Sequence, residues 1–134
     1  MAKCSKGKEL IITTENKVGM LAEVTSAITG QGVNISAVCA YSMEGNAIFM
    51  LLTSDDKKAK SAAASKGWKV EESDVVVVEL ADKIGAVKEI ADKLKAKGVN
   101  LHYIYGTTCT CSPDCASRLV LKAEDSDALV SALK

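Results

Sequence analysis

Asn16-Lys17-Val18-Gly19 is followed, after one amphipathic segment, by Gly32-Val33-Asn34-Ile35. The chain then repeats this order, because Asp82-Lys83-Ile84-Gly85 is followed in the same way by Gly98-Val99-Asn100-Leu101. The two copies align without a gap, position 82 falling 66 residues after position 16. Solenoid repeats have periods of roughly 20–50 residues, so the longer period indicates a duplicated domain.

The composition is that of a folded protein without a strongly charged surface. Hydrophobic residues make up 48% of the 134 residues, which argues against disorder. The formal net charge is zero and Arg118 is the only arginine, so neither nucleic acid nor an anionic membrane is an expected partner. A single unit of about 65 residues would bury little surface. We therefore expect the copies to share a sheet or core and to form a homodimer or higher oligomer.

The sequence predicts neither a signal peptide nor a membrane span. The apolar run Leu10–Ile12 that follows the basic N-terminus is too short for a signal core. No segment approaches the roughly 18 apolar residues of a membrane span. Five cysteines, an odd number, favour a reducing compartment over a secreted disulfide framework. We expect a cytoplasmic protein, with Cys4 in a disordered N-terminus and Cys39 as a small core residue.

The first copy is expected to contain four strands and two helices. Its expected strands cover residues 9–14, 36–43, 47–53 and 68–72. The helix after Gly19 is expected to bury an apolar stripe made of Val18, Leu21, Val24 and Ile28. Glu44-Gly45-Asn46 is a hairpin signature, and a second helix opens at Asp55. The order β-α-β-β-α-β is that of a ferredoxin-like unit.

The second copy repeats this pattern from about Asp74 but has no final strand. Its expected elements are strands at 75–80, 102–108 and 117–123 and helices after Gly85 and at 125–133. The predicted apolar stripe of its first helix is Ile84, Val87, Ile90, Ala91 and Leu94. Without a closing strand, the edge at Val75–Leu80 would be bare, and we expect Trp68–Glu72 or a neighbouring subunit to cover it.

The fold prediction is therefore α+β, with two tandem ferredoxin-like βαββαβ units, antiparallel sheets and a second unit that lacks its last strand. The predicted domains cover residues 1–73 and 74–134.

The stretch from Thr14 to Leu21 resembles the loop of ACT domains, whose pattern is roughly His-x-Asn-(Lys/Arg)-Pro-Gly-(Val/Met)-Leu. The stretch from Gln31 to Ile35 resembles the Gly-(Val/Ile)-Asn-Ile segment of the same family. The whole chain thus resembles two tandem ACT domains. ACT domains are known mostly as regulatory modules that bind amino acids and that sit on, or associate with, enzymes of amino-acid metabolism. The resemblance implies an allosteric regulator or sensor that binds an amino acid and has no catalytic activity of its own.

The same resemblance assigns candidate ligand-binding residues. In the first copy they are Thr14, Asn16, Val18, Gly19, Met20, Leu21, Asn34 and Ile35. A weaker second site would contain Asp82, Ile84, Gly85 and Asn100. It is weaker because Leu80 replaces the polar Thr14, and because Asp82 would repel a carboxylate although it could attract an ammonium group.

A free amino acid is a zwitterion, and the predicted junction offers partners for both of its charges. Its carboxylate would accept hydrogen bonds from the exposed amides of Val18 to Leu21 at the helix start. The side-chain amides of Asn16 and Asn34 each carry a donor and an acceptor and could bridge both ends of the ligand. The structural alternative is that Asn16 caps the helix, that Asn34 completes a turn, and that one copy or both serve only as dimerisation surfaces.

A cysteine-rich loop, Cys109-Thr110-Cys111-Ser112-Pro113-Asp114-Cys115, is inserted in the second hairpin. Cys109, Cys111 and Cys115 could bind zinc, with Cys39, His102, Asp114 or a partner subunit as the fourth ligand. Cys109 or Cys111 could instead pair reversibly with Cys115 as a redox switch, or all three thiols could be inert. Zinc is the only cofactor that the sequence suggests. No catalytic constellation is visible, so we do not expect an enzyme.

Overall fold

The computed structural model describes residues 3–107 and 117–134. Its elements are β1 (Lys3–Glu15), α1 (Met20–Thr29), β2 (Ile35–Met43), β3 (Asn46–Thr53), α2 (Asp56–Ser65), β4 (Lys69–Leu80), α3 (Ala86–Ala96), β5 (Leu101–Thr107), β6 (Ser117–Ala123) and α4 (Ser126–Leu133). The strand order is β2-β3-β1-β4-β6-β5, and both hairpins pair antiparallel. This confirms the predicted α+β fold built from two βαββαβ-like repeats.

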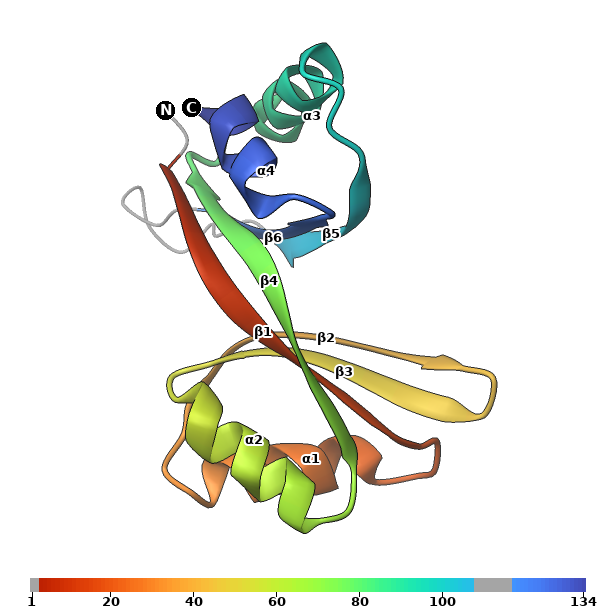
Figure 1. Ribbon diagram of the computed structural model, residues 1–134. Helices are drawn as coiled ribbons and strands as arrows, with labels where there is room; N and C mark the ends of the chain where they lie inside the picture. The colour runs from red at the N-terminus through yellow and green to blue at the C-terminus, as the bar shows by residue number, and fades with distance from the viewer. Residues whose placement is uncertain (1–2, 108–116) are drawn as a thin grey trace. The chain divides into compact units, whose positions relative to one another are not determined.

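The chain packs as two compact units (Figure 1). The first unit is Lys8–Ser73, and the second unit is Asp74–Lys134 together with Met1–Gly7. In each unit, two helices cover one face of the strands: α1 and α2 in the first, α3 and α4 in the second. We propose that the duplicated sequences meet between residues 73 and 74. In the folded chain, however, residues 3–7 pack with the second unit.

The second unit is closed by the start of β1, which corrects two predictions. A Cβ atom added to Gly7 would lie 3.9 Å from a methyl group of Val75, which places β1 directly beside β4. The edge at Val75–Leu80 is therefore covered by the N-terminal strand, and neither Trp68–Glu72 nor another subunit is needed. Cys4 lies in β1 and packs against the core of the second unit, so the prediction of a disordered Cys4 is wrong.

The strands predicted at 68–72 and 75–80 form one continuous strand, β4. The side chains of Glu71 to Asp74 are exposed or half-buried, and the strand continues through them. Its start belongs to the first unit, where Val70 and the preceding Trp68 pack against the core. Its end belongs to the second unit, where Val75, Val76 and Val78 are fully buried.

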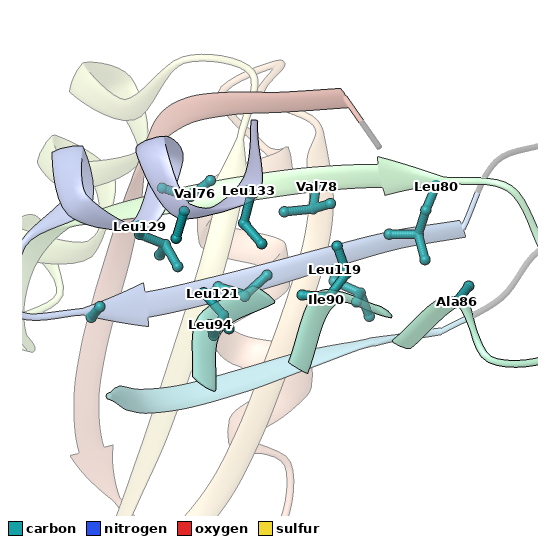
Figure 2. Packing of buried hydrophobic residues seen from close by; sticks show 12 residues of the cluster. Val76, Val78, Leu80, Ala86, Ile90, Leu94, Leu119, Leu121, Leu129 and Leu133 are labelled. Carbon is teal, nitrogen blue, oxygen red and sulfur yellow. The ribbon is translucent and has the colours of Figure 1, made fainter. Parts of the chain in front are cut away.

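The buried residues of α1 and α3 differ from the predicted stripes. The predicted stripes begin at Val18 and Ile84, which precede the helices, whereas the first helical residues, Met20 and Ala86, are buried. Met20, Val24 and Ile28 are the buried residues of α1, at the four-residue spacing that places side chains on one face. The equivalent residues of α3 are Ala86, Ile90 and Leu94, and Figure 2 shows Ile90 and Leu94 beside Leu119 and Leu121 of β6. Five residues of the predicted stripes are exposed instead: Val18, Leu21, Ile84, Val87 and Ala91.

The turn and cap predictions are confirmed. Glu44 and Gly45 both have positive φ angles, 51° and 82°, as a two-residue hairpin turn requires. The Asp55 carboxylate accepts a hydrogen bond from the Lys58 amide at the start of α2, at 3.1 Å. All described helices are short, and none has the length and apolar character needed to cross a membrane.

Candidate functional site

The strand-to-helix junctions of the two units have nearly the same backbone geometry. Gly19 and Gly85 directly precede α1 and α3 with φ angles of 92° and 87°, in the left-handed region that suits glycine. In the first unit, the Met20 amide donates to the Lys17 carbonyl at 3.3 Å. In the second, the Ala86 amide donates to the Lys83 carbonyl at 3.2 Å. The predicted need for glycine at this point thus has a direct conformational cause.

Each junction presents backbone amides that have no partner. Within the described part of the chain, the amides of Val18 and Gly19 make no hydrogen bond, and neither do those of Ile84 and Gly85. The prediction of a free amide is wrong for Met20, which donates to Lys17. Free amides next to the positive end of a helix dipole are suited to an anionic group such as a carboxylate.

The side chains of Thr14 and Asn16 have different surroundings. Thr14 is buried, and its hydroxyl donates to the Glu15 carbonyl at 2.8 Å. The Asn16 backbone amide donates to the Gly45 carbonyl at 3.1 Å, which ties the junction to the hairpin turn, and the residue is exposed. No side chain caps α1, so the alternative that Asn16 is a helix cap does not hold.

Asn34 lies at the far end of the first unit from Asn16. The backbone amide of Asn34 donates to the Ser54 hydroxyl at 2.8 Å, and the backbone carbonyl of Asn34 accepts from the Ser54 backbone amide at 2.9 Å. β2 begins with the next residue and pairs at its other end with Asn46, which also pairs with Glu15. At about 3.3 Å per residue, the length of β2 separates the two asparagines by roughly 25 Å. Within one unit, therefore, Asn16 and Asn34 cannot bridge one small ligand as predicted.

A cavity of about 360 Å³ adjoins the second junction. Its walls combine the junction with β5 and β6, and the lining residues are Leu80, Asp82, Lys83, Gly85, Ala86, Val87, Lys88, Gly106, Thr107, Ser117 and Leu119. This volume is within the range of about 300–1,000 Å³ found for small-molecule sites. A cavity of about 340 Å³ in the first unit lies along α1 and includes none of the residues predicted for the first site.

Two residues of the second cavity were not predicted from the sequence. A Cβ atom added to Gly106 would overlap the Arg118 carbonyl oxygen, so only glycine allows β5 to approach β6 here. A glycine inside a predicted strand was the available signal for this close approach. Ser117 is buried, and its hydroxyl has no hydrogen-bond partner. Nothing in the local sequence indicates this, because the state of the hydroxyl depends on residues distant in the chain.

The cysteine loop with Cys109, Cys111, Cys115 and Asp114 lies outside the described residues. Among the residues that are described, no three His, Cys, Asp or Glu side chains are placed to hold a metal ion. Zinc binding by the loop thus stays a prediction, which metal analysis of the reduced protein would test. Burial raises the pKa of the Cys39 thiol, and the Glu9 carboxylate raises it further. Burial also raises the pKa of the Cys4 thiol, against a smaller opposite effect of Lys93.

Comparison with known proteins agrees with this architecture. A family model described as an ACT domain pair matches residues 7–125. Protein BT0572 from Bacteroides thetaiotaomicron is 28% identical, over 97% of this chain and 88% of that one, with a TM-score of 0.86. The ligand-free regulatory subunit of aspartate kinase from Thermus thermophilus shares the fold at 12% identity, over 98% of this chain and 93% of that one, with a TM-score of 0.68. No curated protein matches the sequence.

Proposed function

We propose, from the premise that this chain belongs to the family of ACT domain pairs, that it is a regulatory protein that binds an amino acid. The observation that carries the proposal is the repeated junction, where backbone amides without partners, among them those of Gly19 and Gly85, adjoin a helix start in each unit. These amides would bind the α-carboxylate of the ligand. An asparagine side-chain oxygen, or Asp82 in the second unit, would accept from its ammonium group.

The separation of Asn16 from Asn34 favours a site that is shared between two copies of the chain. β2 and β5 stand at the ends of the strand order, and each carries an exposed apolar residue, Val38 and Ile104 respectively. Such edges favour pairing with another chain. If two β2 strands pair antiparallel, the Asn34 end of one lies beside the Asn16 end of the other. We therefore propose a homodimer in which both copies contribute to each ligand site of the first unit.

A shared site would also explain how binding produces a signal. A ligand held by both copies stabilises the arrangement in which they are paired and shifts the population toward it. This change would act on an enzyme of amino-acid metabolism in the cytoplasm, or serve as a sensor output. The aspartate kinase subunit from Thermus thermophilus is itself a regulatory subunit, although its likeness to this chain extends to the fold alone.

A thermal-shift screen against the proteinogenic amino acids tests the proposed function. A ligand at about 100 times its dissociation constant adds roughly 2.7 kcal/mol to the stability of the folded state. For a domain of this size, the melting temperature should rise by several degrees. Amines and carboxylic acids that lack one of the two charges serve as control compounds and should have little effect. A screen in which no amino acid raises the melting temperature would refute amino-acid binding.

A further inference from the structure

The pairing register shows which way the Ser117 side chain points. Ser117 lies directly opposite Leu80 in the antiparallel pair of β6 and β4. Opposed residues of such a pair have their side chains on the same face of the sheet. Leu80 points into the core of the second unit, at the end of the cluster where Figure 2 also shows Ala86. The Ser117 hydroxyl is therefore on the helix-covered face, beside the start of α3, where the cavity lies.

The hydroxyl at this place is used differently in the two units. In the first unit the equivalent pair is Thr14 and Ala47, and the Thr14 hydroxyl donates to the Glu15 carbonyl. In the second unit the hydroxyl belongs to Ser117, whose residue is only 4% exposed and whose Oγ has no hydrogen-bond partner. A buried hydroxyl without a partner is costly, so a ligand group that pairs with it gains binding energy.

The rest of the cavity can accommodate an amino-acid backbone. Asp82 brings a negative charge to it, and Lys83 and Lys88 bring positive charges that are ion-paired with Glu89 at 3.2 Å and with Asp92 at 2.6 Å. The free amide of Gly85 adds a donor for a carboxylate. Leu80, Leu119 and Ala86 form apolar walls around Ser117. A side chain that enters this end of the cavity would meet the Ser117 hydroxyl beside these apolar side chains, with Thr107 also in the cavity wall.

We propose that the cavity of the second unit selects α-amino acids whose short side chain ends in a hydroxyl or carboxamide group, with Ser117 as the specificity-determining residue. The inference rests on the proposed function for the α-amino-acid part of the ligand. The polar end of the ligand side chain would exchange a hydrogen bond with Ser117 Oγ. A binding site that hydrogen-bonds a polar group of its ligand discriminates strongly against an analogue that lacks this group.

The test compares ligands of nearly equal shape on the intact chain. Threonine is compared with valine, and asparagine with leucine, in NMR titrations that follow the amides of Gly85 and Gly106. These amides report on the second unit separately from the first. The polar member of each pair should bind about tenfold more tightly, which corresponds to about 1.4 kcal/mol. In the Ser117→Ala variant this preference should fall to less than about twofold.

Ser131→Ala is the matched control, because Ser131 is an exposed residue of α4 that does not line the cavity. It should leave the tenfold preference unchanged. Equal binding of the paired ligands to the parent protein would overturn the role of Ser117, and so would a preference that survives Ser117→Ala. Either result leaves amino-acid binding itself intact. Absence of binding by every amino acid would instead overturn the proposed function together with this inference.

Discussion

Gly19 and Gly85 are the residues on which the two junctions depend. Both have positive φ angles, and a Cβ atom added to either would meet nothing within 4 Å. Replacement by alanine is therefore opposed by backbone conformation and not by crowding. We expect Gly19→Ala and Gly85→Ala each to lower the free energy of unfolding by about 1 kcal/mol, measured by urea denaturation.

Gly7→Ala is the control for these two variants, because Gly7 has an ordinary backbone conformation and room for the methyl group. It should be neutral or slightly stabilising, since alanine loses less conformational freedom than glycine on folding. If all three variants had the same stability, the left-handed glycines would not be what shapes the junctions.

The unpartnered hydroxyl of Ser117 gives a second prediction at this scale. Ser117→Ala removes a buried polar group that has no partner. Without any ligand, the variant should be more stable than the parent by about 1 kcal/mol. Calorimetry should show a rise of several degrees in the melting temperature. A variant that is less stable than the parent would mean that the hydroxyl already has a partner in the protein.

At the scale of strands and helices, each unit depends on a strand that also belongs to the other. Lys3–Gly7 closes the second unit, and Lys69–Ser73 forms part of the first. The side chain of Lys6 also pairs with Asp127 of α4, which holds the start of β1 to that unit. The Asp127 carboxylate raises the pKa of Lys6, so this contribution is present at neutral pH and is lost only as pH rises through the raised pKa.

Deletion of residues 2–7 should therefore weaken the second unit selectively. The deletion exposes the edge of β4 at Val75–Leu80 and removes the packing of Cys4. Hydrogen exchange at the amides of Val76 and Val78 should become at least about tenfold faster, whereas exchange at Phe49 and Leu51 in the first unit changes little. Lys6→Gln removes only the exposed ion pair and should have little effect. Equal loss of protection in both units would contradict the assignment of Lys3–Gly7 to the second unit.

The elements that were predicted correctly are those specified by neighbouring residues. The turn at Glu44 and Gly45 and the cap at Asp55 depend on local backbone chemistry, and the sequence indicates both of them. The continuity of β4 and the start of β1 depend on pairing between residues about 70 positions apart, as for Gly7 and Val75. Local periodicity contains no information about such pairing, so the sequence predicts two separate strands, at 68–72 and 75–80, where the structure has one.

The same distinction applies to the candidate site. Gly19 and Gly85 can be predicted from the sequence, because a glycine just before a helix allows a backbone conformation that other residues rarely adopt. Ser117 was not predicted, because its burial and its lack of a partner follow from Leu80 opposite it and from α3 above it. The joint role predicted for Asn16 and Asn34 was wrong within one unit, because the length of β2 separates them.

At the scale of the whole molecule, a site shared between two copies makes a specific prediction for mixed dimers. Asn16→Ala and Asn34→Ala should each weaken amino-acid binding by about tenfold, the effect of losing one hydrogen bond to a charged ligand. In a dimer of the two variants, one first-unit site carries both changes and the other carries neither. Mixing them should restore one parent-like site in each mixed dimer, measured by calorimetric titration.

In the mixed dimer, the intact Asn16 and the intact Asn34 lie on different chains. If each site were formed within one chain, every site would still lack one asparagine, and mixing would not restore binding. Ala64→Lys, on an exposed position of α2, is the control for the mixing procedure and should leave binding unchanged before and after mixing. Affinity that stays low in the mixture, while sedimentation shows that mixed dimers have formed, would contradict the shared site.

The most direct test of the central claim is an NMR titration of the 14.1 kDa chain with the amino acid that gives the largest thermal shift. The account predicts that the amides of Val18 and Gly19, or of Ile84 and Gly85, show the largest changes in chemical shift, since they have no partner in the described structure. Saturable binding that leaves these four amides unshifted, and shifts amides elsewhere, would contradict it.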